Sequence, residues 1–147
     1  DTPVVDSSAI PTGEIASVEG TPMDFRTEKQ IGQDIRADFE QLHFTGGYDH
    51  NYVLGRPGEK KIMANAYCRE SGIALEAETD CCGVQFYAGN FIGEQTGKGG
   101  AAYHDRSAFC LESQFYPNAV NEPDFPSPVV KAGHTYHTET SYRFYLR

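Results

Sequence analysis

The sequence predicts an all-β fold, and more specifically an antiparallel β-sandwich. Short stretches rich in β-branched and aromatic residues recur along its 147 residues, and loops rich in Gly and Pro separate them. In residues 73–79, Ile73, Leu75 and Ala77 alternate with Ala and Glu, which is the pattern of a strand with one buried face. Only one stretch carries helical spacing, so strands dominate the prediction.

Eight segments have strand character. They are residues 4–5, 14–18, 48–54, 61–68, 73–79, 84–88, 107–115 and 136–145. Residues 69–72, Arg-Glu-Ser-Gly, separate the fourth segment from the fifth and are a hairpin signal. Short strands joined by such turns are typical of a sandwich.

One helix is predicted, between residues 28 and 42. Ile31, Ile35, Phe39 and Leu42 recur there at helical spacing, which would place them on one apolar face. Gly32 weakens this helix because glycine costs about 1 kcal/mol relative to alanine in a helix interior.

Length and charge exclude several classes of partner. The length suits one domain or part of a larger one. The formal net charge of −9 disfavours nucleic acid and anionic lipid, both of which require a basic surface. No apolar run is long enough to cross a bilayer, and the opening residues lack the basic start and apolar block of a signal peptide. We therefore expect neither a nucleic-acid nor a membrane partner.

The cysteines and histidines do not predict a metal site. The cysteines are Cys68, Cys81, Cys82 and Cys110. Their spacing matches no zinc pattern, and reduced thiols favour a reducing compartment, hence the cytoplasm. A Cys68–Cys110 bridge stays open without geometry, as does a periplasmic or secreted parent protein. His134 and His137 would face opposite sides of a strand, so no metal is assigned.

Glu112 is the candidate for proton transfer. It lies in the strand-like segment 107–115, followed at once by a loop rich in Pro and Asn. On that strand it would share a face with Cys110 and Gln114. If that face is inward, burial would suit the carboxylate to general acid/base work. The alternative is an ordinary solvent-facing strand carboxylate.

Two further tracts interleave polar side chains with aromatic rings, as sugar sites do. Residues 46–52 contain Asp49, and residues 83–91 contain Gln85 and Tyr87 on one face of a strand. Rings pack on the C–H faces of a sugar while carboxylate and amide groups bind its hydroxyls. Alternatively, Asp49 caps a turn and Gln85 is a satisfied amide in a core strand.

Taken together, these tracts resemble the galactose mutarotase (aldose 1-epimerase) family. The stretches that carry the resemblance are residues 47–52, 83–91 and 109–114, extended by 10–14, 24–26, 117–121, 125–127 and 132–136. They cover nearly the whole chain in order.

The resemblance implies a β-supersandwich of which residues 1–147 are the C-terminal portion, the N-terminal half of the same domain being absent. It implies interconversion of the α and β anomers of free aldoses such as galactose and glucose, without a cofactor. By this resemblance Glu112 is the catalytic base, and Asp49 and Gln85 bind the substrate. The family's general-acid histidine belongs to the absent half.

A half sandwich would expose apolar faces and unpaired strand edges. We therefore expect the isolated chain to be weakly stable, to self-associate or to need its N-terminal partner, and to have at most trace activity. Two alternatives stay open. One is a carbohydrate-binding module of the same fold, which binds sugar without chemistry. The other is a regulatory relative that has kept the fold and lost catalysis.

Overall fold

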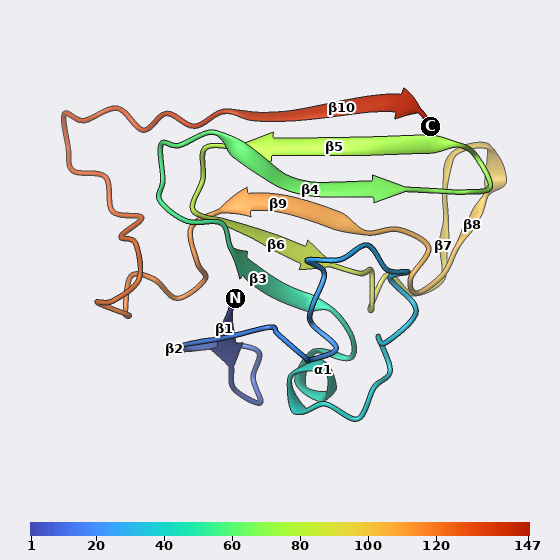
Figure 1. Cartoon of the computed structure of the whole chain (residues 1–147), viewed down its shortest axis with the longest axis horizontal. Helices are drawn as coiled ribbons and strands as arrows, with labels where there is room; N and C mark the ends of the chain where they lie inside the picture. The colour runs from blue at the N-terminus through green and yellow to red at the C-terminus, as the bar shows by residue number, and fades with distance from the viewer.

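A computed structural model describes residues 1–147 and confirms the all-β class (Figure 1). The chain forms ten strands, one α-helix and one short 3-10 helix. In chain order they are β1 (Thr2–Val5), β2 (Pro11–Ala16), α1 (Glu40–Thr45), β3 (Asp49–Val53), β4 (Lys61–Tyr67), β5 (Ile73–Thr79), β6 (Gly83–Tyr87), β7 (Gln95–Thr96), η1 (Lys98–Gly100), β8 (Ala102–Tyr103), β9 (Cys110–Gln114) and β10 (Thr140–Leu146).

Two three-stranded antiparallel sheets form the sandwich. One has the order β3-β6-β9 and the other β10-β5-β4, while β1-β2 and β7-β8 are separate two-stranded ribbons. The hairpin expected at residues 69–72 is confirmed, because β4 and β5 pair on either side of it. The segments expected at 14–18, 107–115 and 136–145 overlap strands whose ends differ by up to four residues from the prediction.

The two sheets pack through a small apolar cluster. Met63 of β4 and Ala77 of β5 contact Val84 of β6, and Leu111 of β9 packs against the same cluster. A larger cluster lies farther along the β6 strand, where Tyr48 and Phe86 stack with ring centroids 5.5 Å apart. This second cluster is covered by the irregular segment that precedes α1.

The helix expected over residues 28–42 is wrong in extent. Only residues 40–45 are helical, and the stretch before them consists of turns such as the bond from Ala37 N to Asp34 O (2.9 Å). The apolar spacing nevertheless marked a shared environment, because Ile35 and Leu42 are buried in the larger cluster and Ile31 packs against it. Packing against the sheet orders these side chains without the continuous hydrogen bonds of a helix, and Gly32 favours the turns.

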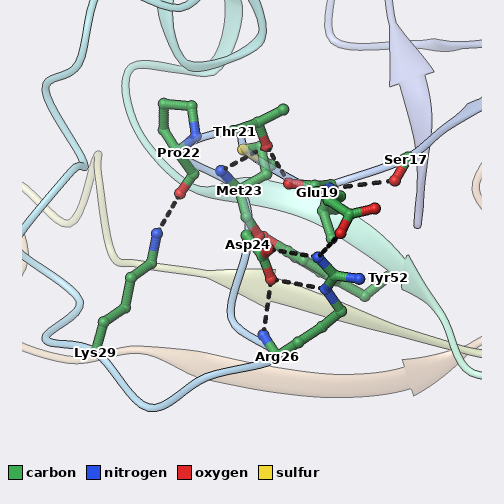
Figure 2. Close-up of polar contacts among 10 residues, drawn as sticks. Ser17, Glu19, Thr21, Pro22, Met23, Asp24, Arg26, Lys29 and Tyr52 are labelled. Atoms are coloured by element: carbon green, nitrogen blue, oxygen red, sulfur yellow. Dashed lines mark hydrogen bonds and ion pairs between the residues drawn. The ribbon is translucent and has the colours of Figure 1, made fainter.

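Polar contacts order this covering segment, and one of them joins it to the sheet (Figure 2). Lys29 Nζ donates to Pro22 O at 2.7 Å and to the Asp34 carboxylate at 2.9 Å, and it lies 4.5 Å from the centre of the Phe25 ring. Tyr52 Oη on β3 donates to Met23 O at 3.1 Å. These contacts hold the Met23 and Phe25 side chains over the sheet.

The second sheet is only partly covered. Strand β10 has no neighbour beyond it, and Figure 1 shows it along one side of the molecule. Phe144 and Leu146 are paired with Leu75 and Ile73 of β5, so all four share one face. Phe144 is 68% exposed and Leu146 81% exposed. The chain therefore presents an apolar sheet surface beside a free strand edge, which we call the β10 face.

Candidate functional site

The three residues expected at the site lie on adjacent strands of one sheet. Asp49 opens β3, Gln85 is central in β6 and Glu112 is central in β9. Gln85 is directly opposite Glu112 on one side and Asn51 on the other. Asp49 lies two residues from Asn51 along β3, so its side chain emerges on the same face. Residues distant in sequence are thus gathered on one surface.

A hydrogen bond joins the two residues expected to bind substrate. Gln85 Nε2 donates to Asp49 Oδ1 at 2.8 Å, and both side chains are half-buried. This bond fixes one carboxylate oxygen of Asp49 and leaves its other oxygen as an acceptor. The pair can therefore present both an acceptor and an amide donor to a ligand hydroxyl.

Glu112 lies directly opposite Gln85 but is exposed. The inward environment that would suit proton transfer is not made by the residues of this chain. The site is an open face rather than a closed cavity. A cavity of about 310 Å³ lies elsewhere, between Asp80, Cys81, Phe115 and Tyr136, and none of the three site residues lines it.

The opposite face of the same strands forms the core. Phe86 and Tyr52 point into the larger cluster, as the alternation of strand side chains requires. His50 also lies on this face with no exposed surface, and burial lowers its pKa to about 4. Its Nδ1 accepts a hydrogen bond from Asp49 N at 3.2 Å. His50 is consequently a neutral core histidine, turned away from Glu112.

A second row of side chains crosses the site face beside the first. Tyr87 is opposite Asp49 on one side and Cys110 on the other. Tyr87 Oη accepts a hydrogen bond from Phe91 N at 2.9 Å, which ties the following loop to this row. Burial raises the pKa of the Cys110 thiol, and the charges of Glu112 and Asp49 raise it further. Strand alternation in the sequence already placed Cys110 with Glu112 and Tyr87 with Gln85.

The remaining candidates lie outside this face. His134 and His137 are exposed in the segment before β10, and no group of three or more His, Cys, Asp or Glu side chains is arranged to hold a metal ion. All four cysteines are free thiols, so Cys68 and Cys110 are not bridged. No helix has the length and hydropathy that crossing a bilayer requires.

Comparison with known proteins places this chain in one family. The family model described as aldose 1-epimerase matches residues 1–143. Galactose mutarotase of Sus scrofa is 44% identical over 141 residues, covering 95% of this chain and 40% of the relative. Aldose 1-epimerase of Escherichia coli (strain K12) is 36% identical over 143 residues, covering 95% of this chain and 41% of the relative.

Solved structures agree with the fold. The GalM/aldose epimerase homologue from C. elegans superposes with a TM-score of 0.74 at 29% identity, covering 97% of this chain and 42% of that one. Galactose 1-epimerase from Lactobacillus acidophilus NCFM has a TM-score of 0.62 at 21% identity, covering 99% of this chain and 41% of that one, and supports the fold alone.

The fold is that of a mutarotase-like β-sandwich. The chain belongs to the aldose 1-epimerase family. It spans about 40% of the length of the curated relatives that it matches.

Proposed function

We propose that residues 1–147 are the C-terminal portion of an aldose 1-epimerase domain and carry its catalytic base. The complete protein would interconvert the α and β anomers of free aldoses such as galactose or glucose. One observation carries this proposal: Glu112 lies directly opposite Gln85, which is itself bonded to Asp49, on a single open face. Family membership supports the reaction class, because relatives are named galactose mutarotase and aldose 1-epimerase.

The chemistry follows from these residue types. Glu112 takes the proton from the C1 hydroxyl while an acid protonates the ring oxygen, and the C1–O5 bond breaks to give the open-chain aldehyde. Rotation about C1–C2 presents the other face of the carbonyl, and the ring recloses with the two proton transfers reversed. Asp49 and Gln85 hold the sugar hydroxyls so that C1 stays beside Glu112 during the rotation.

The acid is expected from outside this chain. His50, the histidine nearest to Asp49 in sequence, is buried on the opposite face with a pKa near 4. The exposed position of Glu112 leaves room for further polypeptide over the site.

The β10 face offers an apolar surface on which the N-terminal half can pack, or through which a second copy of the chain can associate. The free thiols favour a reducing compartment, hence the cytoplasm.

The decisive experiment uses the full-length protein. Glu112→Gln keeps the size of the side chain and removes its basicity, so polarimetry on fresh α-glucose should show a fall in kcat of at least about 100-fold, the scale of a lost general base. Galactose binding by calorimetry should survive. Glu70→Gln, in the exposed β4–β5 turn, is the matched control and should change neither kcat nor galactose binding. An unchanged rate in Glu112→Gln rejects the proposed base.

The alternative is a carbohydrate-binding module of the same fold. The mixture of Asp49, Gln85 and Tyr87 on one face is the observation that favours it, since these groups can bind sugar without chemistry. A full-length protein that binds galactose but shows no enzyme-dependent mutarotation would establish this alternative. The 147-residue chain alone should show at most trace activity in the same polarimetric assay.

A further inference from the structure

Three buried polar atoms next to the site have no hydrogen-bond partner within the chain. They are Asn51 Nδ2, Asn51 Oδ1 and Gln85 Oε1. Asn51 is only 3% exposed. Buried side-chain amides are almost always hydrogen-bonded, because leaving them unpaired costs the solvation that they lost. Such a concentration of unpaired atoms beside Asp49 and Glu112 requires a partner of some kind.

The position of Asn51 restricts what that partner is. Asn51 is directly opposite Gln85, which places their Cβ atoms about 5 Å apart on one face of the sheet. Its carboxamide lies over Gly83, where an added Cβ would overlap Asn51 Oδ1 and come within 3.0 Å of the Tyr116 ring. Thr2 Oγ1 donates to Asn51 O at 2.7 Å and holds the backbone of β3 in place. The Asn51 side chain is thus enclosed, and only a small partner reaches it.

We propose that Asn51 is a positioning residue of the sugar site, acting through one buried water that accepts from Asn51 Nδ2 and donates to Gln85 Oε1. A buried water typically bridges such otherwise unpaired groups and makes two to four bonds. The two amides are cross-strand neighbours that make no hydrogen bond to each other, so one water is the smallest partner that can satisfy both. The inference rests on the proposed function, since Gln85 is the binding residue that Asn51 orients.

The bridge selects one of the two orientations of the Gln85 amide. With Oε1 turned toward the donor of Asn51, Gln85 Nε2 faces Asp49 and donates to its Oδ1 at 2.8 Å. The flipped amide would set its oxygen against the Asp49 carboxylate, two acceptors facing each other. The bridged donor of Asn51 and the Asp49 carboxylate thus favour the same orientation of Gln85, and Asn51 supports the site without touching the sugar itself.

NMR of the 15N-labelled full-length protein tests the bridge without any substitution. The side-chain amide protons of Asn51 and Gln85 should both show cross-relaxation to one long-lived water, and one Gln85 amide proton should be shifted downfield by its bond to Asp49. The absence of the shared water signal overturns the proposed bridge.

Two variants test the positioning role. Asn51→Asp replaces the Nδ2 donor by an acceptor, so the downfield Gln85 signal should disappear and the dissociation constant for galactose should rise about tenfold or more, the scale of one lost hydrogen bond to a charged group. Asn65→Asp adds the same charge at an exposed position of β4 and should change neither the Gln85 signal nor the dissociation constant for galactose. If Asn51→Asp alters neither the Gln85 signal nor the galactose affinity, Asn51 does not position Gln85 and the proposed role is overturned.

The two proposals fail in different ways. A full-length wild-type protein that shows the bridge but binds no galactose argues against the proposed sugar site and leaves the Asn51 contact intact. A full-length wild-type protein that binds galactose while Asn51→Asp binds it equally well argues against Asn51 alone. If Asn51→Asp does not fold, the water signal of the wild-type protein still decides whether the bridge exists.

Discussion

Acid should destabilise the chain through His50. This side chain has no exposed surface, and burial lowers its pKa from 6.5 to about 4. The folded state therefore favours the neutral ring. Above pH 6.5 the ring is neutral in both folded and unfolded chains, so it imposes no penalty. Below pH 6.5 only the unfolded chain takes up the proton readily, and stability falls until the folded-state pKa is reached.

The magnitude follows from that difference in pKa. A shift from 6.5 to about 4 corresponds to about 3 kcal/mol, since each pKa unit is about 1.4 kcal/mol. Domains of this size have total stabilities of about 5–15 kcal/mol, so the loss is a large fraction of the whole. It should accumulate between pH 6.5 and pH 4.

Urea denaturation at a series of pH values measures this loss of stability. In His50→Gln the new side chain is neutral at every pH and retains an acceptor for Asp49 N. The free energy of unfolding of this variant should therefore lack the decrease that protonation of His50 causes between pH 6.5 and pH 4. Carboxylates such as Asp24, whose pKa Arg26 holds well below its usual range, contribute equally to both proteins and cancel in the difference. His134→Gln, at an exposed position, is the control and should follow the wild type. Parallel pH profiles for His50→Gln and the wild type would refute the reasoning.

Three further predictions concern packing and association. Gly83→Ala should cost about 1–3 kcal/mol in urea denaturation, because the added Cβ overlaps Asn51 Oδ1 and crowds the Tyr116 ring; an unchanged midpoint would show that the site relaxes freely. Lys29→Met should lower thermal stability by about 1–3 kcal/mol, since it removes two hydrogen bonds from a side chain only 11% exposed, and an equal melting temperature would contradict that role. Phe144→Lys should reduce self-association in sedimentation velocity, because Phe144 is 68% exposed on the β10 face; unaltered association would place the contact elsewhere.

Local pattern predicted the strands of the site well. Alternation in residues 84–88 and 107–115 placed Gln85 with Tyr87 and Glu112 with Cys110, and the structure confirms both pairs of faces. A period of two is a local property of an extended chain, so it can be read without tertiary information. The helix over 28–42 failed because its apolar spacing reflected contact with a distant sheet, a tertiary effect that overrides local propensity.

The amino-acid sequence alone determined the all-β class, the strand face that Gln85 shares with Tyr87 and the one that Glu112 shares with Cys110, and the resemblance that assigned roles to Asp49, Gln85 and Glu112. Only the tertiary structure decided that Gln85 stands opposite Glu112, that Asn51 is enclosed with unpaired atoms, and that the β10 face is uncovered. The physical reason is that pairing register joins strands tens of residues apart through backbone hydrogen bonds. Every residue type except proline can make these bonds, so local sequence does not encode which strands pair.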